Sequence, residues 1–268
     1  MVSLAPNLTE IVFLLGRQDR LVGVTRFCNY PPEAARLPKV GGIVDPDVER
    51  IVAARPDVVL CTTDGNPKDR VNALEELGIP CFAAAPQDLA GVFRTIEAVG
   101  VLLGVPERGR REAASLSARA ARIAGLARKG PVPRVLFAVS TSPIIAAGNG
   151  TFLDELLRTA GGRNAAASYS GRYPRLSVED LVAAGPDVIF VASMAGVERF
   201  SADVTRWTEV PAFRDDAVVT LDGDLVTRPG PRMVAALEEV SRALSAWRTR
   251  RNAGAGRAEP AGRKGSGP

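Results

Sequence analysis

Residues 48–62 read VERIVAARPDVVLCT, and residues 178–192 read VEDLVAAGPDVIFVA. Eight of the fifteen positions are identical at a constant offset of 130 residues. Each copy predicts a short helix that a proline stops, followed by an apolar run typical of a parallel strand covered on both faces. A helix–Pro–Asp–strand pattern also arises by convergence in α/β proteins, but the shared register in two halves of similar size favours an internal duplication.

The chain around the two copies alternates between strand and helix patterns. We predict strands over residues 2–4, 21–24, 57–61, 80–83, 134–139 and 218–221, helices that begin near residues 9, 47, 67 and 89, and helices over residues 152–159 and 233–247. Such alternation predicts α/β units with doubly wound parallel sheets.

Residues 107–129 form the one long helical pattern that this alternation does not explain. An apolar stripe recurs there at intervals of three and four, at Ala113, Leu116, Ala120, Ile123 and Ala127. A helix of this length spans about 34 Å, which is long for a small α/β unit. We predict that it joins two lobes, the alternative being a long surface helix.

The predicted architecture is therefore two doubly wound α/β lobes joined by a single long backbone helix. Its boundaries are an N-terminal α/β lobe over residues 1–106, the backbone helix over 107–130, and a C-terminal α/β lobe over 131–249. Residues 250–268 are rich in Gly, Ala, Arg, Pro and Lys, and we predict a disordered tail there.

Composition excludes several classes of function. The 268 residues contain no histidine, which removes serine–histidine and cysteine–histidine catalysis and every histidine metal site. The net charge is +4 and much of the excess lies in the tail, so nothing favours a nucleic-acid groove. The three cysteines, Cys28, Cys61 and Cys81, are expected to be buried free thiols, the alternative being one bridge and one free thiol. No run of apolar residues is long enough to span a membrane.

Two stretches are similar to parts of catalytic sites. Gly148-Asn-Gly150-Thr151 at a strand–helix junction is similar to part of a phosphate loop but lacks the Gly-Lys-Ser/Thr ending. Asp222 and Asp224 could form a carboxylate pair, but turn chemistry beside Gly223 explains them better. We therefore predict no catalytic and no metal-binding residue. An enzyme with two nucleotide-type lobes, acting on a nucleotide sugar, stays open as an alternative.

The loops after the first two strands offer a binding site instead. Residues 5–10 follow the first strand at its carboxyl end, where doubly wound sheets bind their ligands. Residues 27–33 follow the second strand and carry Phe27 and Tyr30 in a chain with only 5% aromatic residues. Loop packing is the alternative explanation for these two rings.

Five motifs in order give a specific resemblance. They are SLAPNLTE at 3–10, YPPE at 30–33, PKVGG at 38–42, ERI…RPDVV at 49–59 and DGD…TRPGPR at 222–232. The chain over about 1–248 resembles the substrate-binding proteins of cobalamin-uptake ABC transporters. That class has two α/β lobes on a helical backbone and includes siderophore-, haem- and metal-binding relatives.

The resemblance implies a non-enzymatic importer component that captures cobalamin or a related corrinoid in the cleft between the lobes and delivers it to a membrane permease. It implies no catalytic cofactor, and we expect a monomer. Binding of an iron-siderophore or haem is the close alternative, and a cytosolic corrinoid-handling protein is a more distant one. No signal peptide is visible after Met1. We expect a periplasmic or cell-envelope location if a leader has been removed, and a cytoplasmic one if Met1 is the true start.

The resemblance also implies roles for individual residues. Ala5, Pro6 and Asn7 would line the cleft from the first lobe, and Phe27 and Tyr30 would add apolar walls. Phe27 matches a position where a tyrosine commonly touches the corrin, and Thr62 falls where some members place a tryptophan, so that stacking contact is missing here. Tyr173, Asp224 and Arg228 would contact the ligand from the second lobe.

Members of this class dock onto their permease through one acidic residue at the tip of each lobe. Asp69 and Glu198 are the candidates in this sequence. Subtracting the repeat offset of 130 from Glu198 gives position 68, next to Asp69. The alternative is that both are solvated acids near helix starts, which the helix dipole favours in any case.

Overall fold

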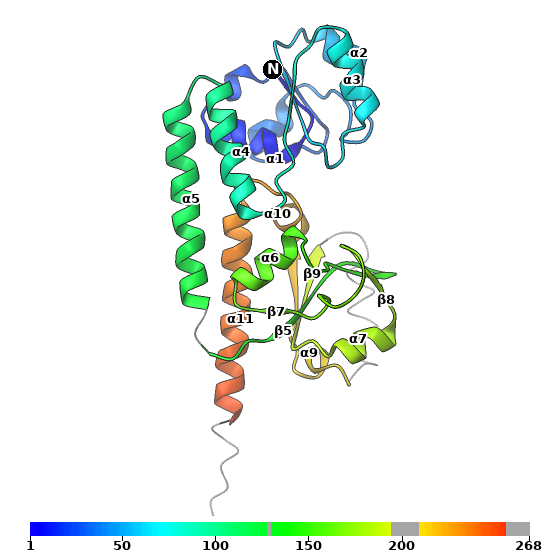
Figure 1. Ribbon diagram of the computed structural model, residues 1–268, viewed down its shortest axis with the longest axis vertical. Helices are drawn as coiled ribbons and strands as arrows, with labels where there is room; N and C mark the ends of the chain where they lie inside the picture. Colours follow the sequence, from blue (N-terminus) through cyan, green and yellow to red (C-terminus); the bar gives the residue numbers. More distant parts are fainter. Residues whose placement is uncertain (128–129, 194–208, 256–268) are drawn as a thin grey trace, which may run out of the picture. The chain divides into compact units, whose positions relative to one another are not determined.

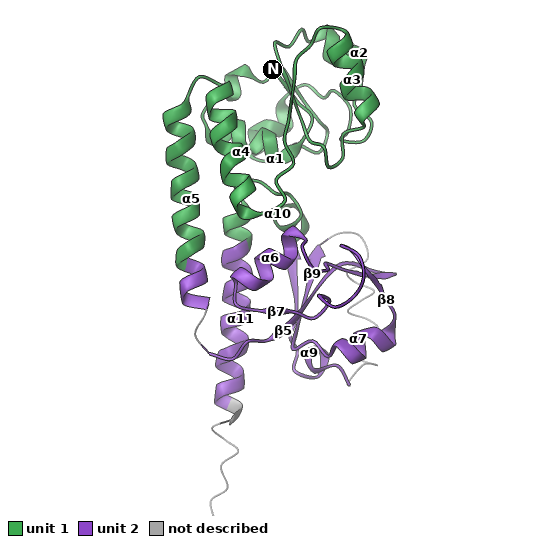
Figure 2. Ribbon diagram, viewed as in Figure 1, with its two compact units in different colours: residues 1–122, 222–236 green, residues 123–221, 237–268 purple. Residues whose placement is uncertain are grey.

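The computed structural model describes residues 1–127, 130–193 and 209–255. The chain divides into two compact units (Figure 2). Unit 1 contains residues 1–122 and 222–236, and unit 2 contains residues 123–221 and 237–268. The sequence placed all of 131–249 in the C-terminal lobe. The structure differs for 222–236, because this segment packs with unit 1.

Unit 1 is built on a parallel sheet whose described strands have the order β2-β1-β3-β4. The strands are β1 (Val2–Ser3), β2 (Gly23–Val24), β3 (Val59–Cys61) and β4 (Cys81–Ala83). Val2 pairs with Gly23 on one side and with Val59 on the other, and Val59 pairs with Cys81. The strands are those that the sequence predicts, shortened at their ends.

Side chains alternate across this sheet, and helices cover both faces. Val2, Val59 and Cys61 point into one hydrophobic cluster with Ile51 of the helix α2 (Val48–Ala53) and Leu74 of the helix α3 (Lys68–Glu76). Ser3 follows Val2 in β1 and faces the other way, where Thr9 Oγ1 of the helix α1 (Pro6–Leu14) donates a hydrogen bond to its hydroxyl. Unit 1 therefore confirms the doubly wound prediction.

The helices of unit 1 begin where the sequence provides caps. Asp47 accepts a hydrogen bond from the amide of Arg50 at the start of α2, and Asp88 accepts one from Gly91 at the start of α4. Figure 1 shows α2 and α3 side by side. The helices are α1 (Pro6–Leu14), α2 (Val48–Ala53), α3 (Lys68–Glu76), α4 (Leu89–Leu102) and α10 (Gly223–Val226), with short 3-10 turns at Gln18–Arg20 and Pro32–Arg36.

The long helix α5 runs from Pro106 to Ala127. Its predicted apolar stripe is buried at all five positions, from Ala113 to Ala127. The helix packs closely on α4 at a pair of glycines, where a Cβ added to Gly100 would lie 2.9 Å from the Cα of Gly109. Residues 107–122 belong to unit 1 and residues 123–127 to unit 2, so one continuous helix contributes to both units.

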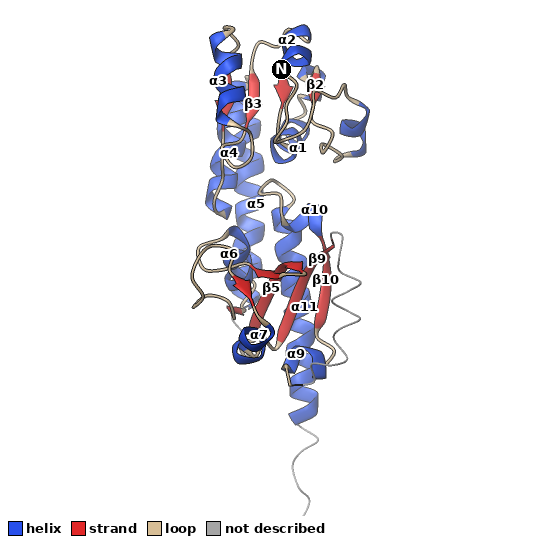
Figure 3. Cartoon of the chain, turned by 90° about the vertical axis from the view of Figure 1, so that its right-hand side faces the viewer, coloured by secondary structure: helices blue, strands red, loops and turns tan. Residues whose placement is uncertain are grey.

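Unit 2 has a mixed sheet whose described strands have the order β10-β9-β5-β6-β8, with β7 beside β5 (Figure 3). The strands β5 and β9 are parallel, whereas β6 is antiparallel to both β5 and β8. The sequence predicted β5, β9 and β10 but not β6, β7 or β8. The bounds are β5 (Arg134–Thr141), β6 (Ile144–Ala146), β7 (Arg163–Asn164), β8 (Arg175–Leu176), β9 (Val188–Ser193) and β10 (Val218–Asp222).

The helices of unit 2 include α6 (Phe152–Thr159), which has the predicted bounds, α7 (Val178–Ala184) and the short α9 (Pro211–Arg214). The last helix, α11, runs from Met233 to Ala255, beyond the predicted end near Trp247. Arg251 explains part of the extension, because its guanidinium lies 5.1 Å from the Trp247 ring and forms an ion pair with Asp187. The rest of the predicted tail, 256–268, lies outside the described residues.

The internal repeat is visible in the backbone of both units. The helices α2 and α7 begin 130 residues apart, and each leads into a strand that pairs in parallel with the first strand of its unit. The partners are Val59 on Val2 in unit 1 and Val188 on Val135 in unit 2. A duplication therefore explains the arrangement of the strands as well as the similarity of the two sequences.

Candidate ligand-binding site

The candidate site lies at the carboxyl edge of the unit 1 sheet. Three connections start there, at Leu4 after β1, Thr25 after β2 and Thr62 after β3, and the segment 222–232 packs onto them. Its side chains come from α1, the loop 25–31 and the segment around α10, all of which belong to unit 1. The cluster that joins them, called the carboxyl-edge cluster below, consists of Glu10, Asn29, Tyr30, Asp224, Arg228 and Arg232.

Glu10 is the buried centre of the carboxyl-edge cluster. Its side chain is only 3% exposed, and it accepts hydrogen bonds of 2.8 and 3.0 Å from Nη2 and Nε of Arg232. Nη1 of Arg228 lies 3.9 Å from the same carboxylate. Desolvation raises the pKa of the Glu10 carboxyl, although the hydrogen bond from Arg232 and the two positive charges act against this. One buried carboxylate thus faces two guanidinium groups.

Arg228 closes a ring of three side chains. It donates to Asp224 Oδ1 at 2.5 Å and to Asn29 Oδ1 at 2.6 Å. Asn29 Nδ2 in turn donates to the other oxygen of Asp224 at 2.7 Å. Arg228 is largely buried, whereas the side chain of Asp224 is 42% exposed. The ring fixes Asp224 with a carboxylate that solvent still reaches.

Asp222 does not join Asp224 as a paired acid. Its side chain accepts a hydrogen bond of 2.9 Å from the backbone amide of Asp224 and caps α10. Asp224 lies in the first turn of α10, and Arg228, which follows the end of that helix, pairs with it from four positions further along the chain. The sequence interpretation of Asp222 as a turn residue is therefore confirmed.

Two aromatic rings stand at the edge of the cluster, and each is 45% exposed. The guanidinium carbon of Arg232 lies 4.1 Å from the centroid of the Tyr30 ring. The guanidinium carbon of Arg26 lies 5.4 Å from that of Phe27, and Arg26 is paired with Asp45 at 2.5 Å. Both distances are within the range of cation–π contacts. The loop thus exposes two rings, each with an arginine over it.

Ala5, Pro6 and Asn7 lie at the start of α1 and are buried. Asn7 Nδ2 donates to the carbonyl oxygen of Pro229 at 2.9 Å, and a Cβ added to Gly230 would lie 3.0 Å from Asn7 Cβ. The turn at Pro229–Gly230 therefore covers the start of α1. The contact of these three residues with a ligand stays a prediction.

Asn66 is a second organising residue. Its Nδ2 donates to the carbonyl oxygens of Leu4 and Ile43, at 3.2 and 2.8 Å, and its Oδ1 accepts from the amide of Thr62 at 2.7 Å. Asn66 is buried. One side chain therefore fixes three loops at the carboxyl edge of the sheet.

The sequence did not assign Glu10, Asn29, Arg232 or Asn66 to the site. Glu10 and Arg232 lie within the quoted motifs but are separated by 222 residues. Asn29 lies just before the YPPE motif, and its partner Asp224 is 195 residues away. Asn-Pro before a helix marks Asn66 only as a turn residue. In each case the neighbouring sequence indicates only a local role, whereas the place of the residue in the site depends on partners far along the chain.

Tyr173 is the predicted site residue in the described part of unit 2. Tyr173 is exposed and follows Arg172, whose carbonyl accepts a hydrogen bond from the amide of Gly148. Glu198 lies outside the described residues. In unit 1, Asp69 lies in the first turn of α3 with a side chain that is 78% exposed, and its carboxylate is 3.8 Å from Nε of Arg70.

The loop at Gly148–Thr151 is not a phosphate site in this structure. Asp154, which is almost fully buried, accepts hydrogen bonds from the amide of Gly150 at 3.2 Å and from Asn164 Nδ2 at 2.9 Å. Thr151 caps α6. A buried carboxylate already occupies the amide that an anion would need, and its charge would repel a phosphate.

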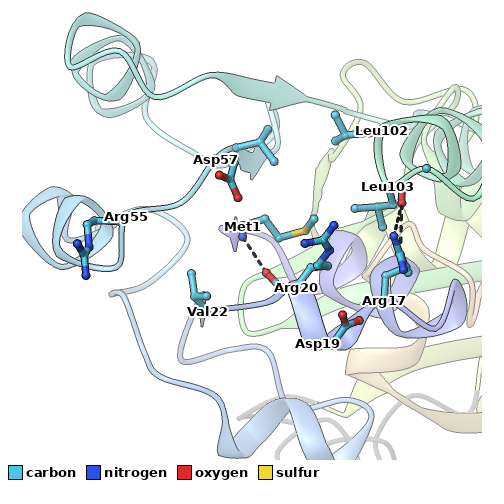
Figure 4. A pocket seen from close by; sticks show the side chains of 11 residues that line it. Met1, Arg17, Asp19, Arg20, Val22, Arg55, Asp57, Leu102 and Leu103 are labelled. Atoms are coloured by element: carbon cyan, nitrogen blue, oxygen red, sulfur yellow. Dashed lines mark hydrogen bonds between the residues drawn. The ribbon is translucent and has the colours of Figure 1, made fainter.

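A hollow of about 660 Å³ lies at the opposite, amino edge of the unit 1 sheet (Figure 4). Met1, Val22 and Val58, which precede β1, β2 and β3, line it together with charged residues of both signs. Arg17 donates from Nε and Nη2 to the carbonyl oxygen of Leu103. Ligands of open α/β sheets bind at the carboxyl edge, so the carboxyl-edge cluster is the better candidate.

Among the residues that the structure describes, no three side chains of His, Cys, Asp and Glu come together in a way that would hold a metal ion. No described helix combines the length and the apolar character that crossing a membrane requires. The three cysteines are free, with Cys28 and Cys61 buried and Cys81 partly buried.

Comparison with known proteins gives a consistent result. The family model described as "Periplasmic binding protein" matches residues 1–225. The ABC transporter substrate-binding lipoprotein YvrC of Bacillus subtilis, itself uncharacterized, is 31% identical over 252 residues, which are 91% of this chain and 79% of that protein.

Two solved structures are similar over nearly the whole chain. The periplasmic vitamin B12 binding protein BtuF of Vibrio cholerae is 29% identical with a TM-score of 0.82, over 92% of this chain and 96% of that one. The periplasmic heme-binding protein RhuT of Roseiflexus sp. RS-1 is 32% identical with a TM-score of 0.83, over 92% and 97%. These similarities confirm the predicted α/β fold class.

Proposed function

Because the chain belongs to the periplasmic binding protein family, we propose that it is the substrate-binding component of an ABC importer that captures cobalamin or a related corrinoid. The name of the Bacillus relative supports the ABC transporter assignment, and the Vibrio structure supports the corrinoid. Both names refer to binding, which supports a role without catalysis. The names also support a location outside the cytoplasm.

The charge balance of the carboxyl-edge cluster is the observation that supports a corrinoid as the ligand. Arg228 and Arg232 are matched by Glu10 and Asp224, so the four charges sum to zero and each guanidinium has a carboxylate partner. The cluster exposes the carboxylate of Asp224 and the ring of Tyr30, and the ring of Phe27 is exposed in the same loop as Tyr30. This combination suits a ligand with an apolar ring face and neutral side arms that donate hydrogen bonds.

A corrinoid offers an apolar ring face and amide side arms that are neutral donors, and its one phosphate would lie away from Asp224. Haem instead carries two carboxylates, which need unpaired cations and would be repelled by Asp224. The charge balance therefore favours a corrinoid over haem. The predicted contact of Tyr173 from unit 2 stays a prediction.

Haem is nevertheless the second candidate. The observation that favours it is the similarity to RhuT, which has slightly higher sequence identity and TM-score than BtuF. If haem is the ligand, its carboxylates find partners other than Arg228 and Arg232.

Absorbance spectroscopy tests the proposal directly, because the candidate ligands are coloured. The protein is mixed separately with cyanocobalamin, haemin and a ferric siderophore, and free ligand is removed by gel filtration. We expect cyanocobalamin to be retained, with a Kd below about 10 μM by calorimetry. Retention of haemin or the siderophore without cyanocobalamin would overturn the corrinoid assignment and leave the transport role standing.

We also propose that Asp69 contacts the permease. Its exposed position in the first turn of α3 supports this role, since a carboxylate there is free to face a basic residue of a partner. Glu198 would be its counterpart on the second lobe, as the sequence predicts.

A further inference from the structure

Arg232 contacts two other side chains of the carboxyl-edge cluster, those of Glu10 and Tyr30. Its Nε and Nη2 both donate to the carboxylate of Glu10, in the two-pronged arrangement that fixes the plane of a guanidinium group. The same guanidinium lies 4.1 Å from the centroid of the Tyr30 ring. Arg232 therefore connects a buried acid to an exposed ring.

Glu10 and Tyr30, the two partners of Arg232, differ in how restricted their side chains are. Glu10 lies within α1 and is 3% exposed, so its carboxylate has one position. Tyr30 lies in the loop after β2 and is 45% exposed. An exposed tyrosine in a loop has several rotamers open to it, and stacking on a fixed guanidinium plane selects among them.

The neighbouring ring provides a contrast within the same loop. Arg26 lies over Phe27, but its guanidinium carbon is 5.4 Å from the ring centroid. Its carboxylate partner is Asp45, and the side chains of Arg26 and Asp45 are both more than half exposed. Only the arginine over Tyr30 is anchored to a buried group.

We infer that Glu10 and Arg232 are positioning residues that hold the ring of Tyr30 ready for the ligand. They act on the ligand through Tyr30. Because the ring is ordered before the ligand arrives, binding does not have to spend free energy on immobilising it. This inference rests on the proposed function in one respect, namely that Tyr30 contacts the ligand.

A purely structural role is the competing explanation. Arg232 also ties the segment 222–236 to α1, and loss of that tie would loosen the whole cluster, including Asp224 and Arg228. The two roles differ in what happens once Tyr30 is removed. A positioning residue then has nothing left to position, whereas a structural residue still matters.

The experiment is a double-mutant cycle with Arg232→Lys and Tyr30→Ala. Lysine keeps the positive charge beside Glu10 but loses the planar fork. We expect Arg232→Lys to weaken cyanocobalamin binding threefold to tenfold in the wild-type background and to have no further effect in the Tyr30→Ala background. An equal loss in both backgrounds would overturn the positioning role.

A ligand-free measurement separates this inference from the proposed function. We expect Arg232→Lys to change the near-ultraviolet circular dichroism of the tyrosines, and we expect this change to vanish in the Tyr30→Ala background. If cyanocobalamin does not bind the wild type, or binds Tyr30→Ala normally, the proposed contact of Tyr30 fails while the spectrum still tests the positioning. An unchanged spectrum would overturn the inference.

Two further variants complete the design. Glu10→Gln keeps the size and one acceptor of the side chain, so it should reproduce the spectral change if Arg232→Lys does not fold. Arg26→Lys is the matched control, because its ion pair is exposed, and we expect a smaller change in spectrum and affinity. A change as large as that of Arg232→Lys would show that anchoring to a buried acid is irrelevant.

Discussion

Arg55 and Gly185 stand 130 residues apart and have the same left-handed backbone conformation, with φ of +45° and +48°. Gly185 ends α7, and Arg55 follows the end of α2. Glycine adopts this conformation without the Cβ conflict that other residues meet. The two copies of the repeat therefore share this left-handed turn, but only the second copy has a glycine at the position.

We expect Arg55→Gly to stabilise the protein by about 1 kcal/mol, because the strain of a left-handed arginine is removed at an exposed position. Urea denaturation measures the change. Gly185→Arg is the reciprocal variant and should destabilise by a similar amount. An unchanged or lower stability of Arg55→Gly would contradict the assignment of strain to this residue.

The contact between α4 and α5 gives a second prediction. A methyl group at Gly100 would lie 2.9 Å from Gly109 Cα, so Gly100→Ala should force the helices apart and destabilise by about 1–3 kcal/mol. Gly125, also in α5, has open space around its Cβ position. Gly125→Ala should therefore stabilise by about 0.5–1 kcal/mol through helix propensity alone. Thermal melting of both variants checks the opposite signs.

Cys61 makes the stability depend on pH in the alkaline range. Burial, together with Cys81 and Glu75, raises the pKa of the Cys61 thiol from 9.0 to about 12. Between these values the folded state keeps a proton that the unfolded state releases, so the free energy of unfolding falls as pH rises. The limiting slope is about 1.4 kcal/mol per pH unit.

Urea denaturation between pH 9 and 11 tests this. We expect the slope of stability against pH to be smaller for Cys61→Ala than for the wild type, whatever constant offset the substitution adds. Equal slopes would show that Cys61 does not titrate abnormally.

The ring of Arg228, Asn29 and Asp224 predicts a loss of ligand affinity on substitution. Arg228→Ala should weaken cyanocobalamin binding by about 1–3 kcal/mol, the usual scale for a lost charged hydrogen bond. Asn29→Ala should have a smaller effect in the same direction, since the ion pair between Arg228 and Asp224 remains. Calorimetry provides both values, and an unchanged affinity of Arg228→Ala would mean that the ring serves folding only.

Docking is tested at Asp69. Asp69→Lys should leave the affinity for the ligand unchanged and weaken association with the permease, because it replaces an attractive charge with a repulsive one. Glu76→Lys, an exposed acid at the other end of α3, is the matched control and should have little effect. Transport assays with permease in proteoliposomes distinguish the two. Normal transport with Asp69→Lys would make Asp69 an ordinary surface acid.

The sequence predicted features that depend on neighbouring residues. Asp47 before Val48 predicts a helix start and caps α2 as expected, and the helix that the sequence predicts near residue 152 begins there with Thr151 as its cap. Continuous apolar runs in the sequence predicted the strands β3 and β9, because a strand covered on both faces is recognised from its own residues. The repeat then predicted α7 and β9 of unit 2 from the corresponding α2 and β3 of unit 1.

What could not be predicted depends on distant partners. Glu10 appears in the sequence as an acid in a helix, and nothing nearby shows that Arg232 makes it a buried centre. The segment 222–236 was assigned to the wrong lobe because a chain that returns to an earlier unit leaves no local mark. The extension of α11 likewise depends on Asp187, which pairs with Arg251 across 64 residues.

Because residues 222–236 return to unit 1, the gene cannot be divided simply into one segment for each unit. A fragment that ended at residue 122 would contain Glu10 but not Arg232, and would bury a carboxylate with its cationic partner missing. The complementary fragment would carry the arginine on a segment deprived of the surface it packs against. Complementation of the two fragments in trans, or a shortened chain that joins 222–236 to residue 122 through a linker, would have to restore that pair before the first half could fold as a module.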